Sequence, residues 1–190
     1  MSKQKKAILI LAIVAIAMIG GTSAYYVSSE RTHNIIATSG VGVELLEETD
    51  NVDPEGQPVP FENIINAVPG ESYSKIPIVR NIDEGSAWVR IHITRTATLS
   101  DGTVVPVPNE LLECDTDSRY WINDGDNYYY YKRALDAGEQ TEPLFTEVTL
   151  GTDLANVYNG ATFNLKLSAQ AVQTANNGQS IESAEGWPEE

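Results

Sequence analysis

Two long segments in which apolar and polar residues alternate constrain the fold more than any other feature of the chain. They cover residues 87–99 and 162–171. Their apolar positions are Ala87, Val89, Ile91, Ile93, Ala97 and Leu99 in the first segment, and Phe163, Leu165, Leu167, Ala169 and Ala171 in the second. Because successive side chains of a strand point to opposite faces, this period predicts two β-strands with one face in the core and one in solvent. Arg95 interrupts the inner face and predicts a bulge or a strand end there.

Shorter strands separated by turn signals are predicted for most of the remaining chain. They cover residues 41–48, 73–79, 103–107, a hairpin over 119–132, and 141–150. Residues 49–60 are predicted to form a surface loop, and one short helical turn fits 150–158. Pro77 has no N–H to donate, so its strand is expected at a sheet edge. The fold class is therefore all-β, as an antiparallel two-sheet sandwich of jelly-roll type over residues 41–173.

The N-terminal residues 1–24 have the pattern of a secretory signal peptide. Three lysines precede an apolar run from Ala7 to Ile19, and small residues follow it. This run of 13 residues is shorter than the roughly 20 that a membrane-spanning helix needs, so cleavage is favoured over a retained anchor. The predicted signal-peptidase junction comprises Thr22, Ala24 and Tyr25, with the cut after Ala24. The mature protein is then expected to be secreted, with contact to the membrane only before cleavage.

The charge and the cysteine content of the chain exclude some classes of function. The chain has a formal charge of −15, and loss of the leader removes three lysines and no acidic residue. A chain this acidic is repelled by nucleic acid, so a nucleic-acid partner is excluded, and its acidity favours solubility. Cys114 is the only cysteine, so no intrachain disulfide can form. The acidic neighbours of Cys114 are expected to raise its thiol pKa, which argues against a reactive nucleophile.

Several short motifs occur in an order that matches a known family. The leader ends in Gly-Gly-Thr-Ser-Ala and is followed at once by Tyr25 and Tyr26, which resembles the junction cut by the dedicated signal peptidase SipW. Tyr26 stands where Phe is more usual. The other motifs are Ser39-Gly40-Val41-Gly42-Val43-Glu44, Val68-Pro69-Gly70-Glu71, Val79-Arg80-Asn81, Ala87-Trp88-Val89-Arg90-Ile91 and Ala169-Gln170-Ala171-Val172-Gln173. Together they resemble the TasA/camelysin group of exported biofilm-matrix proteins of Gram-positive bacteria, over most of residues 15–175.

The resemblance implies a jelly-roll domain, secretion, and assembly into extracellular fibres. In such fibres the N-terminal arm of one subunit completes the sheet of the next, so the partners would be other copies or a related matrix protein. Residues 25–40 are predicted to be this extended arm, with Tyr25, Tyr26, Val27, Ile35 and Ile36 as the proposed donor strand. The alternative is that the arm folds back as an edge strand of its own domain. The acidic segment 174–190 is expected to form a flexible tail, in which Trp187 is the one candidate for contact with the domain.

Catalysis is not expected. The resemblance to camelysin implies a metalloprotease as an alternative, because camelysin-like proteins have been described as such. A helical His-Glu-x-x-His motif would then be needed to bind the zinc ion. His33 and His92 are the only histidines, and neither is followed by Glu. No catalytic, cofactor-binding or metal-binding residue is therefore assigned.

Two binding hypotheses stay open. Carboxylates at Glu113, Asp115, Asp117, Asp124 and Asp126 offer oxygen ligands for calcium, although turn chemistry also explains them. Aromatic residues could instead form a carbohydrate-stacking platform, which would make the protein a monomeric adhesion or glycan-binding module. They are the run Tyr128–Tyr131 and the tryptophans Trp88, Trp121 and Trp187.

Overall fold

A computed structural model of the chain describes residues 25–28, 41–123 and 125–188, and these residues form an all-β fold. The leader residues 1–24 lie outside this part of the chain. Apart from strands, the described residues contain three short 3₁₀ turns. They are η1 (Asn109–Leu111), η2 (Asn156–Tyr158) and η3 (Ile181–Ser183). The turn η2 confirms the helical turn expected between residues 150 and 158.

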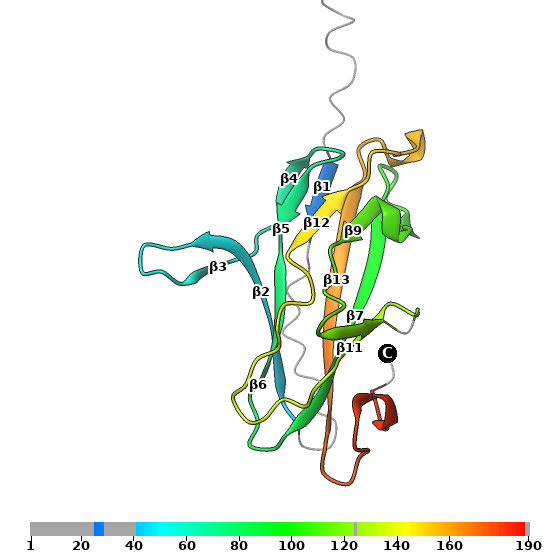
Figure 1. The fold of residues 1–190 in the computed structure, drawn as a ribbon. Helices are drawn as coiled ribbons and strands as arrows, with labels where there is room; N and C mark the ends of the chain where they lie inside the picture. Colours follow the sequence, from blue (N-terminus) through cyan, green and yellow to red (C-terminus); the bar gives the residue numbers. More distant parts are fainter. Residues whose placement is uncertain (1–24, 29–40, 124, 189–190) are drawn as a thin grey trace, which may run out of the picture.

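The largest sheet has seven strands and contains both long alternating segments (Figure 1). Its path runs β10-β11-β7-β13-β1-β4, and β8 pairs with β7 beside that path. The strands are β1 (Tyr25–Ser28), β4 (Ile64–Ala67), β7 (Ala87–Thr98), β8 (Val104–Pro106), β10 (Trp121–Asn123), β11 (Tyr128–Tyr131) and β13 (Thr162–Gln173). The antiparallel pair β7–β13 is the longest strand pair of this sheet. Its register continues through twelve residue pairs, from Ala87↔Gln173 to Thr98↔Thr162.

Two sheets of three strands complete the fold. One has the order β5-β12-β9, with β5 (Ser72–Ser74), β12 (Glu147–Leu150) and β9 (Leu112–Cys114). The other has the order β3-β2-β6, with β3 (Pro58–Pro60), β2 (Val43–Val52) and β6 (Ile76–Asn81). In the second sheet β6 is the last strand, as predicted from Pro77, but residues 139–144 are hydrogen-bonded along its outer side, for example from the Thr141 N–H to the Val79 carbonyl oxygen at 2.9 Å.

One hydrophobic core joins the three sheets. The inner positions of β7 and β13 are fully buried, as the alternation predicted. They pack in one cluster with Val43 and Val79 of the β3-β2-β6 sheet and with Leu112 and Leu150 of the β5-β12-β9 sheet. Burial of these apolar side chains is the main stabilising contribution to such a fold.

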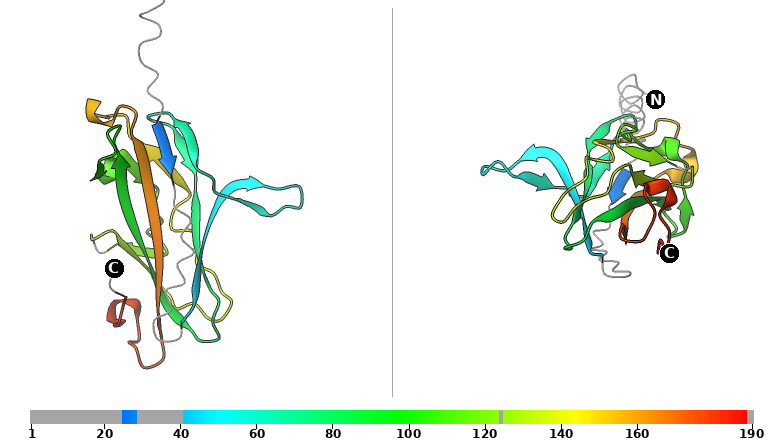
Figure 2. Two further views of the ribbon diagram at one scale, coloured as in Figure 1. Left: turned by 180° about the vertical axis from the view of Figure 1, so that it is seen from behind. Right: turned by 60° about the horizontal axis from the view of Figure 1, so that its bottom comes forward.

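The segment predicted as a surface loop over residues 49–60 is instead a β-hairpin. Strand β2 continues to Val52, and β3 pairs back onto it through Glu48↔Pro60 and Val52↔Pro58, with an irregular register between these pairs. Figures 1 and 2 show this hairpin projecting from the body of the protein. The turn residues of the sequence therefore belong to the hairpin tip, where Asp53 accepts backbone hydrogen bonds from Glu55 and Gln57.

The bulge or strand end predicted at Arg95 is absent from β7. The strand passes through Arg95 in regular register, and the side chain is 7% exposed on the inner face. Its Nε donates to the carbonyl oxygen of Leu112 at 2.9 Å. This hydrogen bond gives the buried guanidinium a partner, so the strand accommodates a charged residue without an irregularity.

The tail also differs from the prediction. Residues 174–188 fold back onto the outer face of the large sheet, and η3 buries Ile181 to 3% exposure. A second hydrophobic cluster forms there around Trp88, Val172 and Ile181. The outer face of β7, expected in solvent, is therefore covered at Trp88 and Arg90, each 8% exposed. Acidic composition predicted flexibility, but Ile181 and Trp187 of this segment pack in that cluster, and Arg90 donates to the carbonyl oxygen of Pro188.

Candidate functional site

The N-terminal strand β1 occupies a slot inside the large sheet, between β13 and β4 (Figure 2). On one side it runs parallel to β13, with Tyr26↔Thr162, Val27↔Phe163 and Ser28↔Asn164 as register partners. On its other side it is antiparallel to β4, and the register shifts between Tyr25 and Tyr26. Strand β1 thus bridges two strands that are not otherwise hydrogen-bonded to each other.

The pairing of β1 is unusual within this fold. Among the strand pairs of the described residues, β1–β13 is the only parallel one. It joins the first and last strands of the described residues, so the long intervening chain between Tyr26 and Thr162 must close into a loop before the pair forms, which has an entropic cost. Strand β1 has only four residues. A short strand with remote partners is held by few hydrogen bonds, and the same bonds could be supplied by a separate segment.

The two strands on either side of β1 differ in burial: β13 has a buried side chain here, and β4 is partly exposed. Phe163 of β13 is fully buried and contacts Tyr158, with 5.5 Å between the ring centres. On β4, Ala67 is buried while Ile65 is 72% exposed. The left-handed backbone of Asn66 (φ 62°) lies between these two residues. Because β4 is the last strand of the sheet, its outer edge has no further strand.

The predicted donor residues are only partly described. Tyr25, Tyr26 and Val27 lie in β1, whereas Ile35 and Ile36 lie outside the described residues. Of the predicted peptidase junction, Tyr25 is the first residue of β1, and Thr22 and Ala24 are outside. Residues 25–28 of the arm pair with their own domain in this single chain, as in the fold-back alternative, although in the interior of the sheet and not at its edge.

Two of the residues considered for catalysis, His92 and Cys114, lie in the described part of the chain. His92 stacks on Tyr128, with ring centres 4.3 Å apart and planes 15° from parallel. Burial raises the pKa of the Cys114 thiol, an effect that the nearby Arg95 partly offsets. The predicted direction for Cys114 is thus confirmed, but burial is a larger cause than the acidic neighbours. His33 is not among the described residues.

The carboxylates considered for calcium have other partners. Asp115 accepts hydrogen bonds from the backbone N–H groups of Thr146 and Glu147, at 2.8 and 2.7 Å. Asp117 pairs with Arg119, which lowers the pKa of the aspartate. Asp126 accepts from the Tyr128 N–H at 3.0 Å. Within residues 25–28, 41–123 and 125–188, no three side chains that could ligate a metal converge, and Asp124 lies outside these ranges.

The aromatic residues separate into two groups. Trp121, Tyr129 and Tyr131 are in the core, with Trp121 2% exposed. Tyr128, Tyr130 and Trp187 lie instead around the guanidinium of Arg90, which is 4.1 Å from the ring centre of Tyr128. Arg90 also donates to Gln170 Oε1 at 2.7 Å. The aromatic residues were singled out from the sequence, but Arg90 as their centre was not, because the members of this cluster come from four separate segments.

A buried ion pair is a second feature that the sequence did not indicate. Lys75 is 1% exposed, and its Nζ lies 2.7 Å from Glu47 Oε1. The same Nζ lies 4.0 Å from the ring centre of Phe61, the residue that follows β3 by one position. These contacts connect the base of the projecting hairpin to the body of the domain.

Comparisons with family models, with curated proteins and with solved structures find no match to this chain. No helix in the described part of the chain is long and apolar enough to cross a membrane.

Proposed function

We propose that this protein is an exported structural protein of the extracellular matrix or cell surface, whose copies assemble into fibres. In this proposal the N-terminal strand of one copy enters the sheet of the next. The observation that carries it is the position of β1 between β13 and β4, where its backbone pairs on both sides.

Strand exchange explains how such a slot could lead to assembly. A β1 segment from another copy would make the same hydrogen bonds in the same register as the chain's own β1. Each copy then donates one strand and accepts another, and a head-to-tail contact that does not close generates a filament. No new interface chemistry is required, because the contacts within the slot already exist in the single chain.

Several features of the sequence support export and the family. The leader pattern, its junction at Thr22, Ala24 and Tyr25, and the single cysteine all fit a secreted protein processed by a SipW-type signal peptidase. The ordered motifs support membership of the TasA/camelysin group. We further propose that the two three-stranded sheets form one layer facing the seven-stranded sheet, as a jelly-roll sandwich. The single core shared by all three sheets supports this arrangement.

The same proposal assigns no catalytic activity and no required cofactor. Two observations support a non-enzymatic protein: the imidazole of His92 stacks on Tyr128, and the pKa of the Cys114 thiol is raised, which disfavours the reactive thiolate. The partners are other copies or a related matrix protein, and calcium remains a prediction.

Electron microscopy and sedimentation of the mature protein test this proposal. The wild-type chain starting at Tyr25 is compared with Val27→Pro, which removes a ladder N–H from β1, and with Val27→Thr, which keeps it. Wild type and Val27→Thr are expected to form filaments, and Val27→Pro is expected to stay monomeric with an unchanged circular dichroism spectrum. Monomers in all three samples over a range of concentration and pH would contradict self-assembly.

A further inference from the structure

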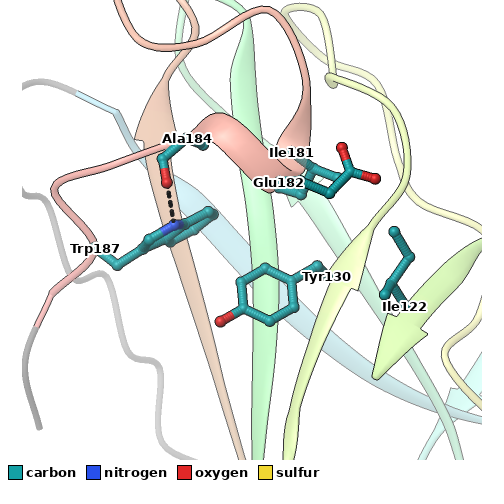
Figure 3. A pocket seen from close by; sticks show the side chains of 6 residues that line it. All are labelled: Ile122, Tyr130, Ile181, Glu182, Ala184 and Trp187. Atoms are coloured by element: carbon teal, nitrogen blue, oxygen red, sulfur yellow. Dashed lines mark hydrogen bonds between the residues drawn. The ribbon is translucent and has the colours of Figure 1, made fainter. Parts of the chain in front are cut away.

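A cavity of about 290 Å³ lies between the C-terminal segment and the β10–β11 hairpin (Figure 3). Both sides of the cavity come from residues far apart in the chain. It is lined by Ile122, Tyr130, Ile181, Glu182, Ala184 and Trp187. Its volume is at the lower end of the range of small-molecule sites in proteins.

The aromatic walls of this cavity offer ring surfaces but few free polar atoms. The indole Nε1 of Trp187 donates to the carbonyl oxygen of Ala184 at 3.1 Å, as the dashed line in Figure 3 shows. The hydroxyl of Tyr130 accepts a hydrogen bond from Arg90 Nη1 at 3.2 Å. The ring centres of Tyr130 and Trp187 are 5.8 Å apart and their planes are at 80°, so the two rings form a corner.

The rings of this corner already contact one cation, the guanidinium of Arg90, whose like charge opposes a ligand cation on the same side of the rings. The Cζ atom of Arg90 lies 4.7 Å from the ring centre of Trp187 and 5.8 Å from that of Tyr130. Electron-rich ring faces attract cations, most strongly when the ring is indole. Glu182 is the charged residue of the cavity wall, and it is exposed at the opening. A hydrogen bond from the Ser180 side chain lowers the pKa of Glu182, so its carboxylate is ionised at neutral pH.

We propose that this cavity binds an organic ammonium ion, with its alkyl groups against Ile122, Ile181 and the two rings and its positive charge facing Glu182. Quaternary ammonium ions are the best-known ligands of aromatic corners of this kind. The acidity of the whole chain, with a formal charge of −15, would attract such a cation and repel an anion. This proposal is independent of fibre assembly, because none of the lining residues belongs to β1, β4 or β13.

A sugar fits the cavity less well. Sugar rings stack on aromatic faces but also need several hydrogen-bond partners in fixed positions. The indole N–H of Trp187 is already engaged, which leaves the O–H donor of Tyr130 and the Glu182 carboxylate as the polar groups for a ligand. An ammonium ion needs only the rings and that carboxylate.

Isothermal titration of the mature protein with choline tests this proposal. The comparison ligands are the uncharged analogue of choline, in which carbon replaces the ammonium nitrogen, and a methyl glucoside. Choline is expected to bind saturably in the millimolar range and to change tryptophan fluorescence, and the two neutral ligands are expected not to bind. Absence of choline binding, equal binding of the uncharged analogue, or binding of the glucoside alone would each overturn the proposal.

Variants localise the binding to this cavity. Glu182→Gln is expected to weaken choline binding roughly two- to fivefold, as for an exposed ion pair. Glu185→Gln is the matched control, because Glu185 is exposed in the same segment but does not line the cavity. Trp187→Phe keeps a ring and is expected to weaken binding without abolishing it. Equal affinities of Glu182→Gln, Trp187→Phe and wild type would overturn the assignment of the site.

Discussion

The guanidinium of Arg90 lies over the indole ring of Trp187, with 4.7 Å between Cζ and the ring centre. Arg90 Nη2 also donates to the carbonyl oxygen of Pro188 at 3.2 Å. These two contacts tie the C-terminal segment to the middle of the large sheet, across nearly one hundred residues of chain.

Replacement of Arg90 by lysine should therefore loosen the tail. Lysine keeps the charge but cannot reproduce the planar fork that contacts Gln170, Tyr130 and Pro188 together. We expect Arg90→Lys to reduce the free energy of unfolding by about 1–3 kcal/mol, and to speed amide hydrogen exchange over residues 174–188. Exchange in that segment equal to that of wild type would contradict the role assigned to Arg90.

The buried pair of Lys75 and Glu47 predicts a strong asymmetry between single and double substitutions. Glu47→Gln removes the carboxylate that faces a buried ammonium and should cost about 3 kcal/mol, measured by urea denaturation. The double variant Glu47→Leu with Lys75→Met replaces both charges by apolar groups, and its cost should be much smaller than that of Glu47→Gln. If the double variant is the less stable of the two, the pair contributes more to stability than this reasoning allows.

Two glycines separate steric overlap from backbone strain. A methyl group on Gly151 would overlap the backbone carbonyl oxygen of Glu110, whereas one on Gly102 would meet nothing within 4 Å. Gly102 instead has a left-handed backbone with φ 86°. We expect Gly102→Ala to cost about 1 kcal/mol, and Gly151→Ala to cost clearly more, because backbone atoms cannot move aside. Thermal unfolding of both variants provides the comparison, and equal costs would contradict it.

The Cys114 thiol predicts how stability changes in alkaline solution. Burial raises its pKa in the folded state above the ordinary value of 9.0. Above that pH the unfolded chain loses the thiol proton first, so the free energy of unfolding should fall as the pH rises from 9.0 toward the folded-state pKa. Cys114→Ala should show a smaller fall over this pH range. Folded protein should also react slowly with thiol reagents, and reaction as fast as in denaturant would show an accessible thiolate.

The long strands and the turns between them could be predicted from the sequence, because they depend on local pattern. The alternation predicted the two long strands, observed at Ala87–Thr98 and Thr162–Gln173, and their buried faces, whereas their pairing with each other is seen only in the structure. The hairpin β10–β11 and the edge strand β8 were also predicted at their observed places.

Apart from the β2–β3 hairpin, whose pairing is local, the errors share a physical cause, which is contact between residues remote in sequence. Arg90 lies on the face of β7 that the alternation assigns to solvent, but residues 174–188 cover that face. Arg95 predicted an interruption of the strand, because the sequence does not show that the Leu112 carbonyl oxygen accepts its hydrogen bond. Lys75 alternates with apolar residues like a surface lysine, but Glu47 and Phe61 enclose it. For the candidate site, the sequence indicated a donor strand at residues 25–28 but could not indicate β13 and β4 as the slot that holds it.

Cross-linking between copies tests strand exchange most directly. Ser28 and Asn164 are register partners across β1 and β13, so cysteines at these two positions can report which copy supplies the strand. One protein carries Ser28→Cys and a second carries Asn164→Cys, both with Cys114→Ser, and they are mixed, assembled and oxidised. Strand exchange predicts disulfide-linked dimers in the mixture, well above the level in either protein alone. Filaments that form without these dimers, while a single chain carrying both cysteines closes its disulfide internally, would contradict strand exchange.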